Sequence, residues 1–208
     1  MNRGRFITLE GVEGAGKSTH VETIRAVLTA AGHETIVTRE PGGTAIGERI
    51  RAILLDGAGA MDAETELLLM FAARAEHLAA KIRPALARGA WVVCDRFTDS
   101  TYAYQGGGRG FSLDRIALLE GHVQGDFRPD LTILFDVDVA TGLARAGRRG
   151  PADRFEREDI AFFERVRQIF LDRAAREPGR FRIIDSRPPV EVVESALRKL
   201  LAGLEPRA

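Results

Sequence analysis

Short apolar runs alternate along this chain with longer segments in which apolar residues recur every three or four positions. Five runs are predicted to be buried β-strands: Phe6–Glu10, Thr35–Arg39, Trp91–Asp95, Leu131–Asp136 and Phe181–Asp185. The periodic segments predict helices at 17–31, 46–55, 63–87, 113–123, 139–146, 160–176 and 189–202. This alternation predicts an α/β fold, with a five-stranded parallel sheet and helices on both faces.

Three polar or glycine-rich stretches follow the predicted strands or face their ends, at residues 39–44, 96–110 and 147–157. In doubly wound α/β folds, ligands bind at the carboxyl ends of the strands. We therefore expect the chemistry of the protein to lie in these stretches and in the segment after the first strand.

The segment after the first strand fits the phosphate-binding pattern G-x-x-x-x-G-K-[ST]. It comprises Gly11, Val12, Glu13, Gly14, Ala15, Gly16, Lys17 and Ser18. Glycines let such a loop turn tightly and direct its N–H groups at phosphate oxygens, and the following helix adds its positive end. Lys17 is expected to reach the β- and γ-phosphates, and the Ser18 hydroxyl to ligate Mg²⁺. The segment therefore predicts binding of a nucleoside triphosphate.

Composition narrows the class of ligand. The 208 residues suit one compact domain, so we expect 1–208 to form a single unit. Thirty basic and thirty acidic residues cancel, which favours small anionic ligands over nucleic acid.

Neither a membrane span nor an apolar signal segment is evident, so the cytoplasm is the expected location. The single cysteine, Cys94, is expected to be a core residue.

Charged and aromatic residues follow the third predicted strand. Asp95 ends this strand and can complete a Mg²⁺ shell, with a plain strand-end aspartate as the alternative. Arg96 can contact a phosphate in a bidentate manner at the same cleft. Ser100, Tyr104 and Gln105 then precede three glycines. Aromatic faces beside an amide suit a base or a sugar, although an ordinary loop with a glycine-rich turn is equally compatible.

An arginine cluster lies between residues 145 and 157, interrupted by glycine and proline: Arg145, Arg148, Arg149, Arg154 and Arg157. Solvated surface charge is one interpretation. In a chain with a phosphate loop, the alternative is a flap whose guanidinium groups neutralise a phosphoryl group in transit, an effect worth about 10³–10⁵ in rate. A flap that excludes water favours a kinase over a hydrolase.

Together these motifs closely resemble the bacterial thymidylate kinases, within the P-loop nucleoside monophosphate kinases, over nearly the whole chain. The resemblance lies in residues 6–19, 38–44, 95–96, 100–110, 125–131 and 153–156. It implies transfer of the ATP γ-phosphoryl group to thymidine 5′-monophosphate (dTMP), giving the diphosphate (dTDP) in dTTP biosynthesis, with Mg²⁺ required. It also implies a P-loop three-layer sandwich with an arginine-bearing lid at about 147–157, and a homodimer. The apolar run 67–71 would be either its interface or core.

The resemblance assigns residues to the binding of ATP, the phosphoryl donor, and to catalysis. The loop through Thr19 would hold the ATP phosphates, and Ser18 and Asp95 would organise Mg²⁺. Glu13 stands where the family places an acidic residue near the acceptor. The implied catalytic residues are Glu13, Lys17, Arg96, Arg149 and Arg154.

The resemblance also assigns residues to the binding of dTMP, the phosphoryl acceptor. Arg96 would clamp the dTMP phosphate, Arg74 would hydrogen-bond the thymine carbonyl, and Tyr104 would crowd the 2′ position. Ser100 and Gln105 would address the other polar edge of the base. The full implied set of substrate-binding residues is Glu40, Arg51, Met70, Phe71, Arg74, Arg96, Ser100, Tyr104 and Gln105.

One position departs from the family pattern. The thymine-stacking phenylalanine commonly lies four residues before the arginine that matches Arg74, on the same helix face. Here that position is Met70, and Phe71 is its neighbour. Methionine can pack on an aromatic ring through its sulfur, so either side chain can cover the base.

Other functions fit the sequence less well. A GTPase switch would use the same phosphate loop, and residues 56–59 fit a D-x-x-G pattern, but its guanine-binding motif needs an asparagine and Asn2 is the only one. A non-catalytic nucleotide-binding module would leave the second anion site without a purpose. A kinase for another monophosphate or for a free deoxynucleoside is the main alternative. The four histidines, at 20, 33, 77 and 122, are expected on the surface or in helix packing.

Overall fold

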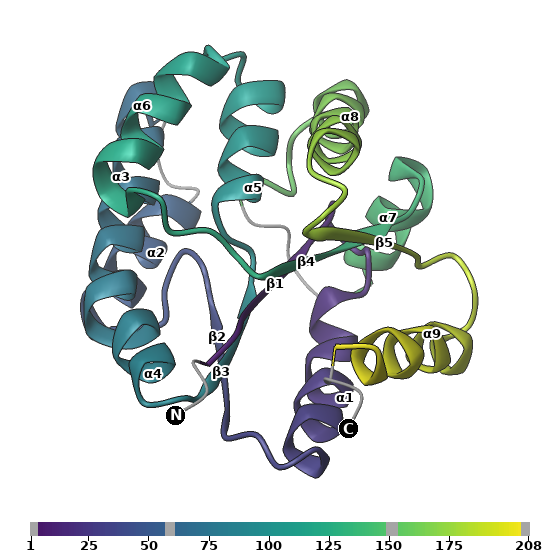
Figure 1. The fold of residues 1–208 in the computed structure, drawn as a ribbon. Coiled ribbons are helices and arrows are strands. Elements are labelled where there is room, and N and C mark those ends of the chain that lie inside the picture. The colour runs from purple at the N-terminus through teal and green to yellow at the C-terminus, as the bar shows by residue number, and fades with distance from the viewer. Residues whose placement is uncertain (1–3, 57–60, 149–153, 205–208) are drawn as a thin grey trace.

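Five strands form one parallel sheet in the order β2-β3-β1-β4-β5 (Figure 1). This computed structural model describes residues 4–56, 61–148 and 154–204. The strands are β1 (Phe6–Glu10), β2 (Thr35–Arg39), β3 (Trp91–Asp95), β4 (Leu131–Asp136) and β5 (Phe181–Asp185). Each neighbouring pair runs parallel. The predicted strands and the predicted α/β fold are therefore confirmed.

Helical segments connect the strands and cover both sides of the sheet. They are α1 (Lys17–Ala30), α2 (Ala45–Leu55), α3 (Ala63–His77), η1 (Leu78–Ile82), α4 (Arg83–Ala87), α5 (Thr98–Thr101), η2 (Tyr102–Gly108), α6 (Leu113–Gln124), α7 (Val139–Ala146), α8 (Ile160–Arg176) and α9 (Val190–Ala202). In Figure 1, α1 and α9 lie together on one side of the sheet, and α3, α5, α6 and α8 lie on the other. No helix in the described ranges has the length and apolarity that crossing a bilayer requires.

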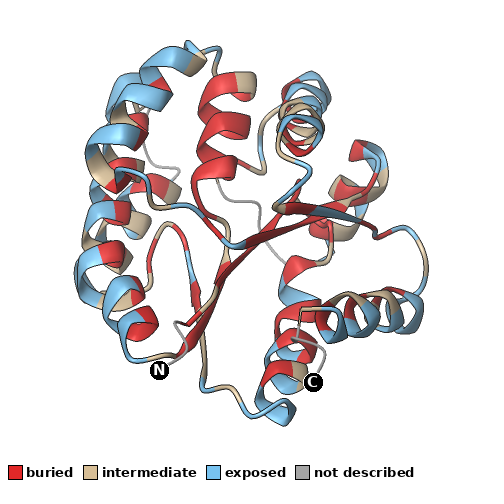
Figure 2. Cartoon of the chain, viewed as in Figure 1, coloured by how far each residue is buried: buried red, intermediate tan, exposed pale blue. Residues whose placement is uncertain are grey.

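Alternating side chains of the central strands build the core on the two faces of the sheet. In β1, Ile7 and Leu9 belong to the cluster that α1 completes with Ile24 and Leu28. Phe6 instead packs in a second cluster, with Cys94 of β3, which is fully buried as expected. Figure 2 shows the buried strands enclosed by helices whose outer surfaces are exposed. Burial on both faces explains why these strands are almost wholly apolar.

The strand register brings three connecting segments to one edge of the sheet. Asp95 of β3 is opposite Leu9 of β1 and Arg39 of β2. Because the strands are parallel and end together, the segments that follow them leave the sheet side by side. The phosphate loop, the turn after β2 and the segment after β3 therefore meet at one place.

The helix predicted at 63–87 is interrupted. The α-helix ends at His77, a wider π-helical turn covers Leu78–Ile82, and a short α-helix continues through Ala87. Pro84 lies in the first turn of that last piece. Proline has no N–H to donate to the preceding turn, so the hydrogen-bond ladder changes register there.

The glycine-rich segment after β3 is helical rather than an ordinary loop. Residues 98–108 form a short α-helix followed by a π-helical segment. A Cβ built on Gly107 would lie 2.6 Å from Ile169 Cγ1, and one on Gly108 would lie 2.3 Å from Phe162 Cε2. The glycines thus let α8 pack directly on this backbone, and that packing outweighs their low helix propensity.

Candidate active site

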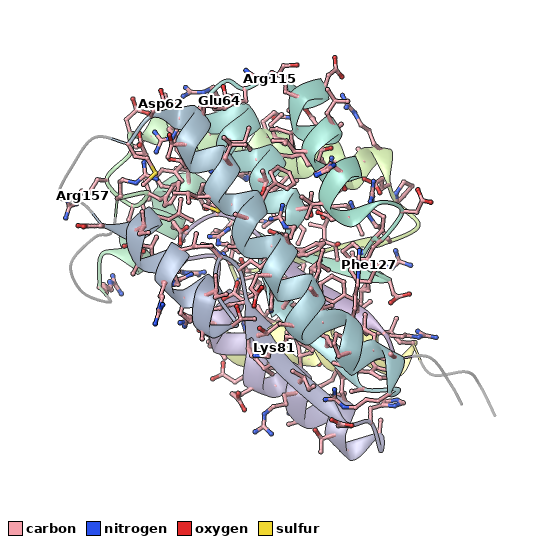
Figure 3. All side chains as sticks on the ribbon, turned by 90° about the vertical axis from the view of Figure 1, so that its left-hand side faces the viewer. Asp62, Glu64, Lys81, Arg115, Phe127 and Arg157 are labelled. Atoms are coloured by element: carbon pink, nitrogen blue, oxygen red, sulfur yellow. The ribbon has the colours of Figure 1, made fainter. Side chains whose placement is uncertain are left out.

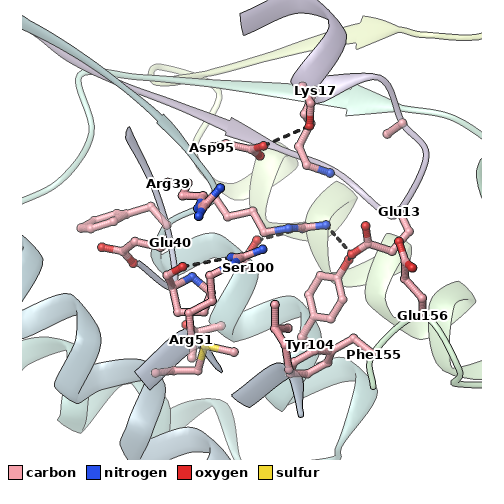
Figure 4. A pocket seen from close by; sticks show the side chains of 18 of the residues that line it. Glu13, Lys17, Arg39, Glu40, Arg51, Asp95, Ser100, Tyr104, Phe155 and Glu156 are labelled. Atoms are coloured by element: carbon pink, nitrogen blue, oxygen red, sulfur yellow. Dashed lines mark hydrogen bonds and ion pairs between the residues drawn. The ribbon is translucent and has the colours of Figure 1, made fainter. Parts of the chain in front are cut away.

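A cavity lies at the carboxyl ends of β1, β2 and β3 (Figure 4). It is lined by side chains from the phosphate loop, the turn after β2, helices α2 and α3, and the segment after β3. The structure brings most of the sequence-predicted residues to this cavity: Glu13, Gly14, Ala15, Gly16, Lys17, Ser18, Glu40, Arg51, Met70, Arg74, Asp95, Arg96, Ser100, Tyr104 and Gln105. Arg39, Phe97 and Thr101 also line it; they lie in the stretches 39–44 and 96–110 singled out from the sequence, which gave them no individual role.

Other predicted residues do not line the cavity. Gly11 and Val12 begin the phosphate loop, and Thr19 lies in the first turn of α1. Phe71 is buried behind Arg74, whose guanidinium lies 5.0 Å from the Phe71 ring centre. Arg149 lies outside the described residues.

The phosphate loop holds its lysine ready for an anion. Lys17 is buried, and its Nζ donates hydrogen bonds to the carbonyl oxygens of Gly11 (2.8 Å) and Val12 (3.0 Å). Burial, with the nearby Arg96 guanidinium as a second cause, lowers the pKa of Lys17 to about 8. Among the described residues, no side chain caps the start of α1, so its first N–H groups remain available to phosphate oxygens.

Ser18 and Asp95 form an oxygen pair beside this loop. The Ser18 hydroxyl donates to Asp95 Oδ2 at 3.4 Å. Asp95 Oδ1 is buried and finds no hydrogen-bond partner in the described part of the chain. Magnesium is commonly held by one or two carboxylates together with substrate phosphates, so this donor set fits Mg²⁺. The described residues contain no cluster of three metal-ligating side chains that would hold a metal alone.

Arg96 is held in the middle of the cavity by the phosphate loop. Its Nη1 donates to the Gly11 carbonyl at 2.9 Å, and its Nη2 donates to Glu13 Oε1 at 2.6 Å. The Tyr104 hydroxyl donates to the same Glu13 oxygen at 3.0 Å. Burial alone would lower the pKa of Arg96, but the nearby acidic groups, Glu13 first among them, together outweigh burial and raise the pKa. Arg96 also adopts a φ of 69°, a costly conformation for a non-glycine residue that is typical of functional sites.

Glu10 is a buried carboxyl next to the site that the sequence analysis did not single out. Its buried carboxyl accepts hydrogen bonds from the Phe97 N–H (2.8 Å) and the Ser100 hydroxyl (2.6 Å). Ser100 Oγ in turn accepts from Arg96 Nη1 at 3.2 Å. Burial, and secondly the charge of Asp99, raises the pKa of Glu10 to about 8. An acidic residue ending an apolar strand was the available signal, the same one that identified Asp95.

Arg74 lies at the far end of the cavity within a buried polar cluster. Its Nε donates to Glu40 Oε2 at 2.7 Å and its Nη2 to Thr101 Oγ1 at 2.9 Å. In the described part of the chain, its buried Nη1 has no acceptor. His77 Nδ1 lies 3.0 Å from Glu40 Oε1, and His77 Nε2 lies 2.7 Å from Thr38 Oγ1. His77 is thus fully buried behind the site. The only sign of this in the sequence was its position three residues after Arg74, on the same helix.

Helix geometry gives Met70 and Phe71 different surroundings. Met70 lines the cavity. Phe71, the next residue of α3, points about 100° away around the helix axis and packs with Leu67, Tyr102 and Ile116. Met70, and not Phe71, is the side chain of this pair that lines the cavity.

Comparison with known proteins identifies the family. The family model for thymidylate kinase matches residues 9–197. The chain is 60% identical over 202 residues to the thymidylate kinase of Pseudomonas entomophila, covering 97% of this chain and 96% of that protein. It is 61% identical over 206 residues to that of Pseudomonas fluorescens (strain SBW25), covering 99% and 98%. The chain belongs to the thymidylate kinase family.

A solved structure supports the same assignment. The crystal structure of the thymidylate kinase from Ehrlichia chaffeensis aligns with a TM-score of 0.77 and 34% identity, covering 97% of this chain and 99% of that one. The predicted family, fold and reaction are thus confirmed. This thymidylate kinase is a phosphotransferase that uses ATP to convert dTMP to dTDP.

The arginine-rich stretch of this thymidylate kinase is only partly described. Arg145 donates to the carbonyl oxygens of Ser186 (2.8 Å) and Arg187 (3.1 Å), outside the lining of the cavity. Arg154 donates from Nε to the Leu54 carbonyl at 3.0 Å, and its Nη2 lies 2.6 Å from Glu66 Oε2. Arg154 thus lies beside the cavity rather than in its lining, whereas residues 155 and 156 line it.

Proposed function

We propose that this one cavity holds both nucleotides, with the ATP phosphates at Lys17 and dTMP extending from Arg96 to Arg74. One observation carries the placement of dTMP: the buried Nη1 of Arg74 points to no acceptor in the described residues although the rest of its guanidinium is paired. A buried, unsatisfied donor is costly, so a ligand oxygen is the natural partner.

The donor side uses the phosphate loop. Residues 11–19 supply backbone N–H groups, and Lys17 exchanges its two carbonyl contacts for phosphate oxygens. Ser18 and Asp95 would hold Mg²⁺ together with those oxygens, and the metal when bound would neutralise charge on the phosphates.

The acceptor phosphate is placed by Arg96. Its guanidinium is fixed by the Gly11 carbonyl, Glu13 and Ser100, so little side-chain entropy is lost on binding. A dTMP phosphate oxygen attacks in line and needs no protein nucleophile, so positioning and charge neutralisation carry the catalysis. We place Tyr104 beside the 2′ position of the sugar, because its ring lies 4.8 Å from the Arg96 guanidinium.

The base is read at the end of the cavity formed by α3. We propose that Arg74 Nη1 donates to the thymine 4-carbonyl, that Met70 covers the ring, and that Gln105 meets the adjoining polar edge. Glu40 and Arg51 complete the lining from the turn after β2 and from α2. Glu40 acts through its 2.7 Å ion pair with Arg74.

We further propose a lid over the cavity. Residues 147–157 would form a lid whose Arg149 and Arg154 stabilise the phosphoryl group in transit; Arg154 would leave its contact with Glu66 to do so. The whole chain would act as one kinase domain in the cytoplasm.

A homodimer would bury the face formed by α2, α3 and α6, which Figure 3 shows from outside. These three helices carry exposed apolar side chains: Ile46 and Ile53 on α2, Leu68 on α3 and Leu118 on α6. Leu67 and Phe71 of the run 67–71 are core residues instead. Light scattering of Leu68→Glu against the unmodified protein tests this assembly, since a charge at an interface would yield monomers.

A coupled assay of ADP formation tests the site assignment. Mg²⁺-ATP is supplied with a panel of deoxy- and ribonucleoside monophosphates, free thymidine, or no acceptor. We expect Arg74→Ala to reduce the preference for dTMP and Arg96→Ala to raise the KM for every monophosphate, with Arg88→Ala as an exposed control. An unchanged base preference in Arg74→Ala would overturn the placement of the base.

A further inference from the structure

Glu66 is a fully buried carboxylate to which the functions proposed above assign no role. It lies on α3, and three donors from other segments surround it. Gln105 Nε2 donates to Glu66 Oε1 at 2.8 Å, and Arg109 Nε donates to the same oxygen at 3.4 Å. Arg154 Nη2 forms an ion pair with Oε2 at 2.6 Å. A carboxylate is buried at high cost unless it is paired, so its presence beside the cavity calls for a reason.

The contact with Glu66 decides which end of the Gln105 amide faces the cavity. An ionised carboxylate can only accept hydrogen bonds, whereas an amide has a donating NH₂ and an accepting carbonyl. The NH₂ of Gln105 must therefore turn to Glu66, and the Arg109 guanidinium, whose Nη2 lies 3.4 Å from Glu66 Oε2, keeps a negative charge favourable there even when Arg154 leaves. Because Gln105 lines the cavity, its carbonyl oxygen is the group left for a ligand.

We propose that Glu66 is a positioning residue for base selection, because it fixes Gln105 as an acceptor beside the donor Nη1 of Arg74. A donor next to an acceptor matches the 4-carbonyl and the N3–H of thymine. Cytosine presents the opposite pair, an amino group at C4 and an unprotonated N3, and is mismatched at both. This inference rests on the proposed placement of the base against Arg74 and Gln105.

Helix geometry links the two halves of this selection. Glu66, Met70 and Arg74 follow one another at intervals of four residues, so they lie along one face of α3. The helix that carries Arg74, the hydrogen-bond donor to the base, therefore also carries Glu66, which orients the amide of Gln105 as the acceptor. A glutamine at position 66 would break this arrangement, because it could pair with either orientation of the Gln105 amide.

The test compares Glu66→Gln with Glu64→Gln. Glu64 lies on the same helix but is exposed and pairs with Arg115, as Figure 3 shows. We expect Glu66→Gln to lower the ratio of kcat/KM for dTMP over dCMP about tenfold, the equivalent of one misplaced hydrogen bond. The KM for ATP should not change, and Glu64→Gln should alter neither quantity. An unchanged ratio in Glu66→Gln would overturn the inference.

A double variant separates this inference from the proposed placement of the base. If Glu66 acts through Gln105, then Glu66→Gln adds no further loss of selectivity to Gln105→Ala. Losses that multiply would overturn the inference. If Gln105→Ala alone leaves the selectivity unchanged, the placement of the base is wrong instead.

A measurement on the unmodified protein covers the case in which Glu66→Gln does not fold. The side-chain NH₂ signals of Gln105, identified by their loss in Gln105→Ala, should exchange slowly with solvent because they face a buried carboxylate. This protection should persist in the dTMP complex. Rapid exchange there would show that the amide is turned the other way and would overturn the inference.

Discussion

Replacing Arg74 by methionine should both destabilise this enzyme and abolish its base preference. Arg74 and Glu40 form an ion pair of 2.7 Å in which the two side chains are only 2% and 4% exposed. Methionine fills much of the same volume but carries no charge. The Glu40 carboxylate would then stay buried with His77 as its remaining polar neighbour.

The expected loss is large because the remaining charge cannot reach water. Removing one partner of a buried ion pair costs about 3–5 kcal/mol. The total stability of a domain is about 5–15 kcal/mol, so the variant should remain folded but unfold at markedly lower urea concentration. Arg88→Met is the matched control, since its pair with Glu34 is 49% and 59% exposed, and such pairs contribute at most about 1 kcal/mol.

A second change distinguishes the buried charge from lost packing. Glu40→Gln in the Arg74→Met background removes the charge and keeps an oxygen that His77 can contact, so most of the stability should return. Base preference should not return, because the donor to the 4-carbonyl is still missing. Urea unfolding and the monophosphate panel measure the two effects. A stability loss in Arg74→Met no larger than that in Arg88→Met, or no recovery in the double variant, would refute a role for the buried charge.

Three further predictions concern the other end of the cavity. Lys17→Ala should lose turnover while circular dichroism shows an intact fold, since Lys17 supplies charge to the phosphates; full activity would contradict the assignment. Ser18→Ala should raise the Mg²⁺ concentration needed for half-maximal rate, which a metal titration measures against exposed Ser112→Ala. The pKa of Glu10 is raised to about 8, above its ordinary value of 4.5, so the stability gained by protonation in the folded state is lost as pH rises through 8. The free energy of unfolding of the unmodified protein should therefore fall relative to Glu10→Gln from pH 4.5 to about 8, by up to about 1.4 kcal/mol per pH unit, and level off above that; parallel profiles would contradict this.

The sequence predicted those features that depend on local pattern. Residues 6–10 and 91–95 are short apolar runs bounded by turns, and both formed strands with the expected limits. The phosphate loop was recognisable because its backbone geometry requires glycine and lysine at fixed spacing. Asp95 and Arg96 could be placed near this loop, since parallel strands end at one edge of a sheet.

The remaining features depend on neighbours that are distant in the sequence. Residues 98–108 are helical because α8 packs on Gly107 and Gly108, and no local pattern reveals that contact. Glu66 is one of several acidic residues near the start of α3, and only the fold shows that it is buried against Gln105 while Glu64 is exposed. His77 was assigned to the surface or to helix packing for the same reason, although it supports Glu40.

The carbonyl oxygen of Gly11 accepts hydrogen bonds from Lys17 at 2.8 Å and from Arg96 at 2.9 Å. Two cations that serve different substrates are thus kept close together by one backbone dipole, and their mutual repulsion is one reason why the pKa of Lys17 is low. A chain of phosphates entering between them turns that repulsion into two attractions. Part of the affinity for the paired nucleotides therefore comes from relief of the repulsion between Lys17 and Arg96 when an anion binds between them.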